Sequence, residues 1–118
     1  MKSNDWAILP RFRIAKGKEI AMGHGKAELL EHVQATGSIA EAAKKMEMSY
    51  MRAWTLIKTM NDCFKEPVVV VERGGKTGGG ASLSATGEKA LALYREMEEQ
   101  SLKAARPSWK QMQKLLQR

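Results

Sequence analysis

Residues 37–87 place two short helical patterns, a run of valines and a glycine-rich loop in direct succession, and few folds accommodate that order. Ser38 and Glu41 have the spacing of a capping box, which starts a helix. The inner face of that helix carries small or apolar residues: Ile39, Ala42, Ala43 and Met46. Ser49 is a good N-cap for the next helix, which is expected to end near Cys63. Small residues on the first helix allow the close crossing of a helix-turn-helix.

A β-hairpin is expected directly after these helices. Residues 68–71 form an unbroken valine run, which predicts a short buried strand, and residues 81–83 are expected to form the returning strand. The connecting loop, residues 74–80, is rich in glycine and carries Lys76, with Arg73 just before it. A flexible cationic hairpin after a helix-turn-helix is typical of a winged helix-turn-helix.

The glycine-rich loop has two alternative interpretations. Gly75 and Lys76 look like the end of a phosphate-binding Walker loop, but that motif needs a glycine where this chain has Val70. Glycines 78–80 also separate the lysine from any helix, so we exclude a nucleotide site. An inert linker is the second alternative, and the strand before the loop and the capped helix after it argue against that role.

The flanking segments complete the expected architecture. Residues 1–22 are predicted to form a lead-in and then a hairpin over 11–22, with Gly17 at its turn. A helix over about 25–35 should end at a left-handed Gly37. The predicted fold is mainly α with a small β component: a winged helix-turn-helix over 23–97, with an N-terminal β-hairpin and a long C-terminal helix.

The C-terminal helix is expected to start at Ser84 and to be interrupted by Pro107, which breaks it or begins a new helix. Apolar residues keep a 3-4-3-4 spacing across that proline: Leu102, Ala105, Trp109, Met112 and Leu116. This seam needs a partner, either the chain's own domain or a second copy. We therefore treat residues 98–118 as a helical extension and a candidate dimerisation element.

Composition limits the class of protein. A chain of 118 residues has room for one domain. Its net charge of +7 arises from 20 Lys and Arg against 13 Asp and Glu, and favours a polyanionic partner, although a merely soluble basic protein remains an alternative. The single cysteine, Cys63, excludes an internal disulfide and suits a reducing compartment. Without an apolar span or a leader pattern, the chain is expected to be cytoplasmic.

The second helix of the helix-turn-helix is the candidate recognition element. Its first turns present Ser49, Tyr50, Arg52 and Thr55. Hydroxyl groups can bond phosphates or base edges, and an arginine can grip guanine with two parallel hydrogen bonds. The alternatives are that Tyr50 packs into the core and that Arg52 is only solvated.

Three further cations are candidate phosphate contacts. Arg73 and Lys76 would act from the wing, and Lys44 would act from the helix that precedes the recognition helix. A charged helix end of this kind is also commonly just solvated. A basic stripe near the C-terminus either contacts DNA or keeps the tail soluble: Lys103, Arg106, Lys110 and Lys114.

No catalytic or metal-binding pattern stands out. His24 and His32 lack partners at metal-ligand spacing, so we expect no metal, and we assign no cofactor. The nearby glutamates 96, 98 and 99 are interpreted as a solvated helix face rather than paired catalytic carboxylates. The protein is therefore not expected to be an enzyme.

These motifs together resemble the N-terminal DNA-binding domain of the ModE family of molybdate-responsive bacterial regulators. The resemblance covers most of residues 23–97, and a Ser-Tyr-x-x-Ala-Trp helix followed by a glycine-rich wing is quite specific to the family. The matching residues are Thr36-Gly37-Ser38-Ile39, Ser49-Tyr50, Ala53-Trp54, Ile57, Met60-Asn61, Glu72-Arg73, residues 74–81, Leu83 and Gly87. Trp54 and Asn61 are interpreted as core packing and helix termination.

The resemblance implies a dimer whose two recognition helices meet a roughly palindromic DNA site. It places Ser49, Tyr50, Arg52 and Thr55 at the major groove, and Arg73 and Lys76 on the wing. Two departures matter. The chain ends at Arg118, short of the family's molybdate-binding region, so direct molybdate binding is not expected. The turn at residues 46–48 also lacks a glycine, so Glu47 must take a strained backbone or the turn must differ.

The sequence thus predicts a sequence-specific, DNA-binding transcriptional regulator that acts as a homodimer. Two alternatives stay open: a protein-interaction module with an unidentified protein partner, and an architectural nucleic-acid binder with little sequence preference.

Overall fold

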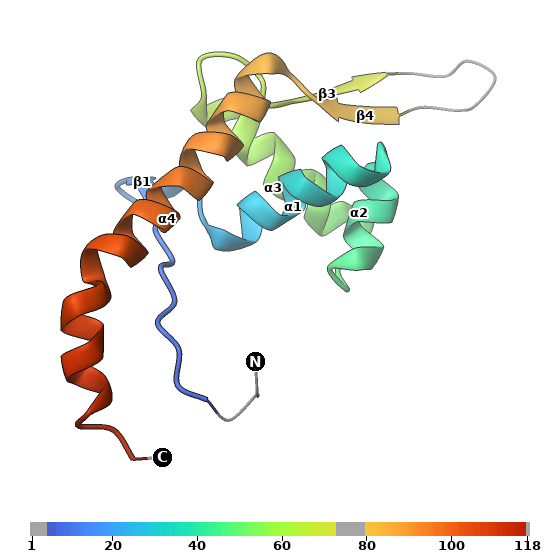
Figure 1. Cartoon of the computed structure of the whole chain (residues 1–118). Coiled ribbons are helices and arrows are strands. Elements are labelled where there is room, and N and C mark those ends of the chain that lie inside the picture. Colours follow the sequence, from blue (N-terminus) through green and yellow to red (C-terminus); the bar gives the residue numbers. More distant parts are fainter. Residues whose placement is uncertain (1–4, 73–79, 118) are drawn as a thin grey trace.

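The computed structural model describes residues 5–72 and 80–117. Figure 1 shows a helical body with two small antiparallel hairpins and a long C-terminal helix, which confirms the predicted fold class. The elements in chain order are β1 (Ile14–Lys16), β2 (Glu19–Met22), α1 (His24–Thr36), α2 (Ile39–Lys45), α3 (Tyr50–Cys63), β3 (Val69–Glu72), β4 (Gly80–Leu83) and α4 (Ala85–Gln113).

The helix boundaries follow from local capping. Gly37 ends α1 with a positive φ of 69°, as glycine permits without strain. The hydroxyl groups of Ser38, Ser49 and Ser84 each accept a hydrogen bond from the backbone N–H three residues later, at 3.0–3.1 Å. The capping box at Ser38 is only half formed, because the Ser38 N–H bonds to Thr36 Oγ1 at 3.2 Å instead of to Glu41.

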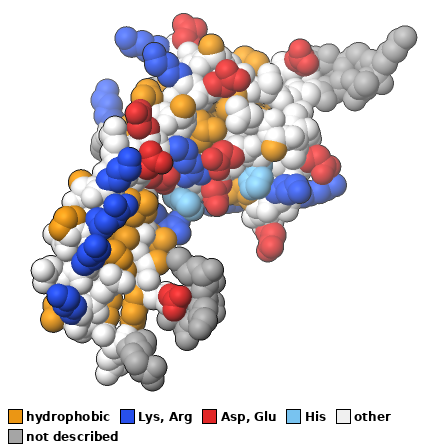
Figure 2. Space-filling model, in the orientation of Figure 1, with side chains coloured by type: hydrophobic (Ala, Val, Ile, Leu, Met, Phe, Trp, Pro, Cys, Tyr) orange, Lys and Arg blue, Asp and Glu red, His pale blue; other side chains and the backbone are white. Residues whose placement is uncertain are grey.

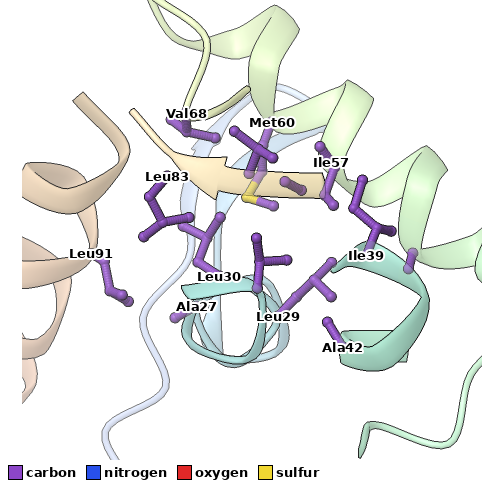
Figure 3. Packing of buried hydrophobic residues seen from close by; sticks show 14 of the residues in the cluster. Ala27, Leu29, Leu30, Ile39, Ala42, Ile57, Met60, Val68, Leu83 and Leu91 are labelled. Atoms are coloured by element: carbon purple, nitrogen blue, oxygen red, sulfur yellow. The ribbon is translucent and has the colours of Figure 1, made fainter. Parts of the chain in front are cut away.

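The core lies between α1, α2, α3 and the hairpin formed by β3 and β4 (Figure 3). Its fully buried members come from every helix of the body, and those on α3 are Ala53, Ile57 and Met60. Leu29 and Leu30 from α1 meet this stripe (Figure 3). The apolar residues that recur at helical spacing in the sequence are therefore the ones that are buried in the structure.

The prediction of a fully buried valine strand is wrong for its second half. Val68 and Val69 are buried, but Val70 and Val71 are 42% and 49% exposed. β3 pairs with β4 from Val69 opposite Leu83 to Glu72 opposite Gly80, and β4 lies against α1 (Figure 1). The β-branched run here reflects strand propensity rather than burial.

The predicted break at Pro107 is also wrong, because α4 continues through it to Gln113. Proline removes one hydrogen bond and leaves the carbonyl of Lys103 without its usual donor. Both residues are exposed, so water can satisfy that carbonyl. The helix likewise passes without interruption through residues 97 and 98, where the helical extension was expected to begin.

The N-terminal segment, residues 5–13, runs beside α4 (Figure 1). The Tyr94 hydroxyl donates to the Phe12 carbonyl at 2.7 Å, and Trp6 Nε1 donates to the Gln117 carbonyl. Burial of the Tyr94 ring also raises the pKa of its hydroxyl group, so it stays a donor at neutral pH. The N-terminal segment is thus hydrogen-bonded at Phe12 to α4 and at Trp6 to the residues that follow α4.

One arginine joins α4 to α1. Arg95 donates to both carboxylate oxygens of Glu31, at 2.9 and 2.6 Å, and to Glu98 at 2.8 Å. The interpretation of Glu98 as solvated is wrong, since its side chain is only 14% exposed in this pair. The hydrogen bonds that Glu31 accepts from Arg95 lower the pKa of Glu31, and donating to Glu31 and Glu98 raises the pKa of Arg95.

The Glu31–Arg95 pair predicts an acid-dependent part of the stability. Because the folded protein lowers the pKa of Glu31, the pair stabilises the fold above the unfolded value and loses its effect as the pH falls through the lowered pKa. Glu31→Gln should lower the free energy of unfolding at neutral pH by less than about 1 kcal/mol, because both side chains are partly exposed. Chemical denaturation across pH should show that difference shrinking in acid, whereas Glu66→Gln in an exposed loop should show no such trend.

Candidate nucleic-acid interface

Helix α3 has one buried face and one open face. Its first turn begins at the exposed Ser49, whose Oγ accepts from the Arg52 N–H at 3.1 Å. Arg52 and Thr55 are exposed on the face opposite Ala53 and Ile57. The four predicted contact residues are all exposed. Arg52 and Thr55 border the same surface hollow on the open face of α3, whereas Tyr50 borders a different one. An α-helix with a solvated polar face of this width has the dimensions to enter the major groove of DNA.

Tyr50 does not pack into the core. Its side chain is 51% exposed, which excludes the alternative that the ring belongs to the interior. It borders a shallow hollow of about 230 Å³ together with Ala40 of α2, Val71 of β3 and Gly80 of β4. Tyr50 thus stands at the junction of the recognition helix, its partner helix and the base of the wing.

The open face of α3 contains a residue that the sequence analysis missed. Met51 is 65% exposed at the second position of the helix. It lines a surface hollow of about 280 Å³ with Arg52, Thr55 and Leu56. Its spacing to Thr55 and Lys58, four and seven residues on, would have identified it as part of the same solvated stripe. A methionine at this place offers a flexible apolar contact beside the polar ones.

The turn between α2 and α3 uses Glu47 in the left-handed conformation, with φ of 55°. The Met48 N–H reaches back to the Ala43 carbonyl at 3.0 Å and closes the turn. The expectation that Glu47 must accept a strained backbone in place of a glycine is confirmed. The side chain of Glu47 is exposed, so the strain is confined to the backbone.

Lys44 lies on the surface of α2 and pairs with Glu41 at 3.4 Å. Its side chain is 76% exposed, so the pair is a weak surface contact that leaves Lys44 free to meet an external phosphate. Arg73 and Lys76, the predicted wing cations, lie outside the residues that the structure describes.

Asn61 fixes the wing to the recognition helix. Its Oδ1 accepts from the N–H groups of Val68 and Val69 at 2.8 and 3.1 Å, and its Nδ2 donates to the Val69 carbonyl at 3.2 Å. The interpretation of Asn61 as a helix terminator is therefore wrong, because the side chain joins α3 to the first strand of the wing. Trp54 is half-buried against the core, as expected.

A second contact ties the wing to the start of the helix-turn-helix. The Ala81 N–H donates to the Gly37 carbonyl at 2.9 Å, so β4 is anchored at the junction of α1 and α2. Because Asn61 holds β3 in the same way, both strands of the hairpin are held against the helices. Four hydrogen bonds thus hold β3 to α3 and β4 to the junction of α1 and α2.

A separate cationic surface follows the outer half of α4. Lys and Arg side chains line up along this helix in Figure 2. The predicted basic stripe is exposed at all four positions: Lys103, Arg106, Lys110 and Lys114. The sequence contains no Asp or Glu after Glu99, so this end of the chain carries uncompensated positive charge.

Over residues 5–72 and 80–117, no three His, Cys, Asp or Glu side chains gather closely enough to hold a metal ion. His24 does have an acidic neighbour, Glu28, at 3.6 Å on the next turn of α1, which the sequence analysis overlooked. In the same part of the chain, no helix has the length and hydropathy needed to cross a membrane.

Comparison with known proteins supplies relatives for this domain. No family model matches the chain. The molybdenum transport protein ModE of Azotobacter vinelandii is 42% identical over 91 residues, which are 77% of this chain and 34% of that protein. The DNA-binding transcriptional dual regulator ModE of Escherichia coli K12 is 41% identical over 66 residues, 56% of this chain and 25% of that protein. The chain thus spans about a third or less of these relatives.

The fold has a counterpart among solved structures. The crystal structure of the CbnR_DBD-DNA complex matches with a TM-score of 0.56 and covers 75% of this chain and 95% of that one. At 19% sequence identity this similarity shows the fold alone. Taken with the sequence relatives, it identifies the chain as a ModE-like protein: a winged helix-turn-helix that is homologous, over a domain-sized stretch, to the ModE transcriptional regulators.

Proposed function

We propose that the protein is a sequence-specific, DNA-binding transcriptional regulator that binds double-stranded DNA as a homodimer in the cytoplasm. The observation that carries the proposal is the open face of α3, where Met51, Arg52 and Thr55 are exposed on a helix fixed by its own cap and core. The net charge of +7 suits a polyanionic partner. The relatives named as transcriptional regulators support the same role.

In this proposal α3 enters the major groove and the wing, residues 73–81, meets the DNA backbone. Arg52 reads a base, and Ser49, Tyr50 and Thr55 contact phosphates or base edges. Lys44, Arg73 and Lys76 neutralise phosphates. No enzymatic step and no cofactor are part of the mechanism.

Arg52→Ala should weaken binding to a specific site by about 1–3 kcal/mol and relax the preference for one base pair. The reason is that a bidentate contact to guanine carries sequence information, whereas a phosphate contact does not. Fluorescence anisotropy on the operator and on single-base variants measures both effects. Equal weakening on every sequence would make Arg52 a phosphate contact.

Lys76→Ala is the matched comparison, because it also removes one cation. It should weaken binding about equally on all sequences and reduce the slope of log K against log salt by about 1. An unchanged salt slope would remove the wing from the phosphate contacts.

We propose that the outer half of α4 forms the dimer contact. This half extends away from the body, and its apolar seam comprises Leu102, Ala105, Trp109, Met112 and Leu116. Met112 is 51% exposed, and on the neighbouring N-terminal segment Trp6 and Leu9 are 55% and 62% exposed. The other four seam residues are half-buried. An extended helix with partly exposed apolar side chains, beside further exposed apolar residues, supports an interface that is filled by another chain.

Met112→Glu should raise the dissociation constant of the dimer at least about tenfold, because it places a charge within the apolar seam. Gln111→Glu is the control, since it adds the same charge at the adjacent exposed position outside the seam. Analytical ultracentrifugation of both variants measures the difference. Equal dimerisation of the two variants would remove the seam from the interface.

The same partly exposed seam supports one other candidate function, a protein-interaction module in which α4 binds a different protein. A wild-type chain that stays monomeric and captures one partner independently of DNA and salt would favour that function. Architectural binding without sequence preference is distinguished by uniform affinity across sequences with a steep salt dependence.

A further inference from the structure

An open groove of about 570 Å³ lies between the N-terminal segment, the start of α1 and the recognition helix. Its walls come from residues 11–13, from β2, from the first turn of α1, from the turn before α3, and from α3 itself. Its size falls in the range of pockets that take small organic molecules. We call it the α1–α3 groove.

The polar lining of the α1–α3 groove is cationic. Arg11, Arg13, Lys26 and Arg52 all border it, and no carboxylate is among the described residues that do so. His24 is also at the rim, with its own acidic neighbour Glu28 outside the groove. Partial burial lowers the pKa of Lys26, which shows that its ammonium group is incompletely hydrated. A negative group in the groove would replace that missing hydration.

The start of α1 adds backbone donors to the same place. Gly23 is the N-cap and supplies no side-chain acceptor, and the first turn contains no acidic residue. The first free N–H groups of α1 therefore lack partners from the cap. A Cβ at Gly25 would meet nothing within 4 Å, so the space beside Gly25 is open. The Lys26 ammonium is held at the groove by a hydrogen bond to the Ile20 carbonyl.

The remaining lining is apolar and adaptable. Phe12, Ile20 and Leu56 form its walls, and Met46 and Met48 contribute from the turn before α3. Methionine side chains adjust to ligands of different shape. The groove therefore combines cations that suit an acidic group with a surface that suits a hydrocarbon or aromatic body.

We propose that the α1–α3 groove binds a small organic anion, with an apolar body and one or two carboxylate- or sulfonate-type groups, and that this ligand opposes DNA binding. The opposition rests on the proposed function, because Arg52 lines the groove and is also the proposed base-reading residue. A ligand anion that pairs with Arg52 withdraws it from DNA. Contact with Met46 and Met48 further biases the turn that orients α3.

The binding step is tested without DNA, using 8-anilinonaphthalene-1-sulfonate as the probe and the neutral N-phenyl-1-naphthylamine as its uncharged counterpart. Titration of the full chain, followed by methyl NMR, should shift the Met46 and Met48 methyl signals with the sulfonate and leave that of Met112 on α4 unchanged. The proposal would be overturned if the neutral amine shifted the Met46 and Met48 signals equally. It would also be overturned if the Met112 signal shifted at a lower probe concentration than those two signals.

Charge-removing variants give a second, independent readout. The double variant Arg13→Gln, Lys26→Gln should weaken sulfonate binding about tenfold, because each of the two substitutions removes a charge-assisted hydrogen bond to the probe. The control Lys89→Gln, Lys103→Gln removes the same charge from exposed positions on α4 and should change the affinity less than about twofold. Equal loss in both double variants would mean that only net charge matters.

The coupling step uses DNA fragments that the wild-type protein retains at physiological salt. Saturating sulfonate probe should release them, whereas inorganic sulfate at equal ionic strength should not. Retention in the presence of bound probe would overturn the coupling while leaving the ligand site in place. Failure of the protein to retain any fragment would overturn the proposed function and leave the NMR result as a separate test of the groove.

Discussion

Replacing Gly87 with alanine is expected to lower the free energy of unfolding by about 3 kcal/mol or more, as forced overpacking against backbone does. Gly87 lies in the first turn of α4, directly over the start of the wing. A Cβ at this position would stand 2.1 Å from the Val68 carbonyl oxygen and 2.9 Å from its carbon. The backbone of Val68 cannot rotate away as a side chain can, so either α4 or the segment that leads into β3 must move.

Gly25→Ala is the matched control for Gly87→Ala. It is also a helical glycine, but its Cβ would meet nothing within 4 Å. This replacement should leave the stability unchanged or raise it by about 0.5–1 kcal/mol, because it reduces the freedom of the unfolded chain. Denaturant unfolding of the two variants measures the contrast. Equal stability of Gly87→Ala and wild type would show that α4 does not pack against Val68 as described.

Asn61→Ala is expected to cost about 2–3 kcal/mol, because it leaves partly buried N–H groups at Val68 and Val69 without an acceptor. It should also weaken DNA binding, since Asn61 holds the first strand of the wing against α3. Asn61→Asp keeps the acceptor and loses only the donor to the Val69 carbonyl, so it should fall between alanine and wild type.

Gln34→Ala, on an exposed position of α1, is the control for Asn61→Ala and should change the stability by no more than about 0.5 kcal/mol. Thermal unfolding and DNA affinity are measured on the same samples. If Asn61→Ala loses stability but keeps full DNA affinity, the wing does not need this anchor to bind DNA.

Local signals in the sequence predicted much of the fold. Serine caps, the glycine at residue 37 and the helical spacing on α3 depend on residues within a turn or two of each other, and the structure has them where they were expected. The sequence wrongly predicted that the end of β3 is buried and that α4 is interrupted at Pro107. Both depend on where solvent lies, which neither a valine run nor a single proline specifies.

Contacts between distant residues were not visible in the sequence. Arg95 and Glu31 are 64 residues apart, and neither position belongs to a recognisable motif. Asn61 is one of the residues that match the ModE family. Its hydrogen bonds to the strand could not be predicted, because they depend on β3 lying beside α3 in the folded chain. The α1–α3 groove joins residues from several separate segments between Arg11 and Leu56, so its cations gave no common pattern.

The candidate recognition face was largely predictable, because exposure on a capped helix follows from its apolar stripe. Arg52 and Thr55 are where the spacing placed them, whereas the exposed Met51 was not singled out from the sequence. Their roles toward DNA remain predictions.

The most direct test of the central claim is selection of genomic DNA fragments by the purified protein at physiological salt, followed by sequencing. A sequence-specific dimeric regulator should recover one recurrent pseudo-palindrome, with two half-sites about one helical turn apart or a multiple of it. Uniform recovery of all fragments, or recovery of none, would contradict the claim.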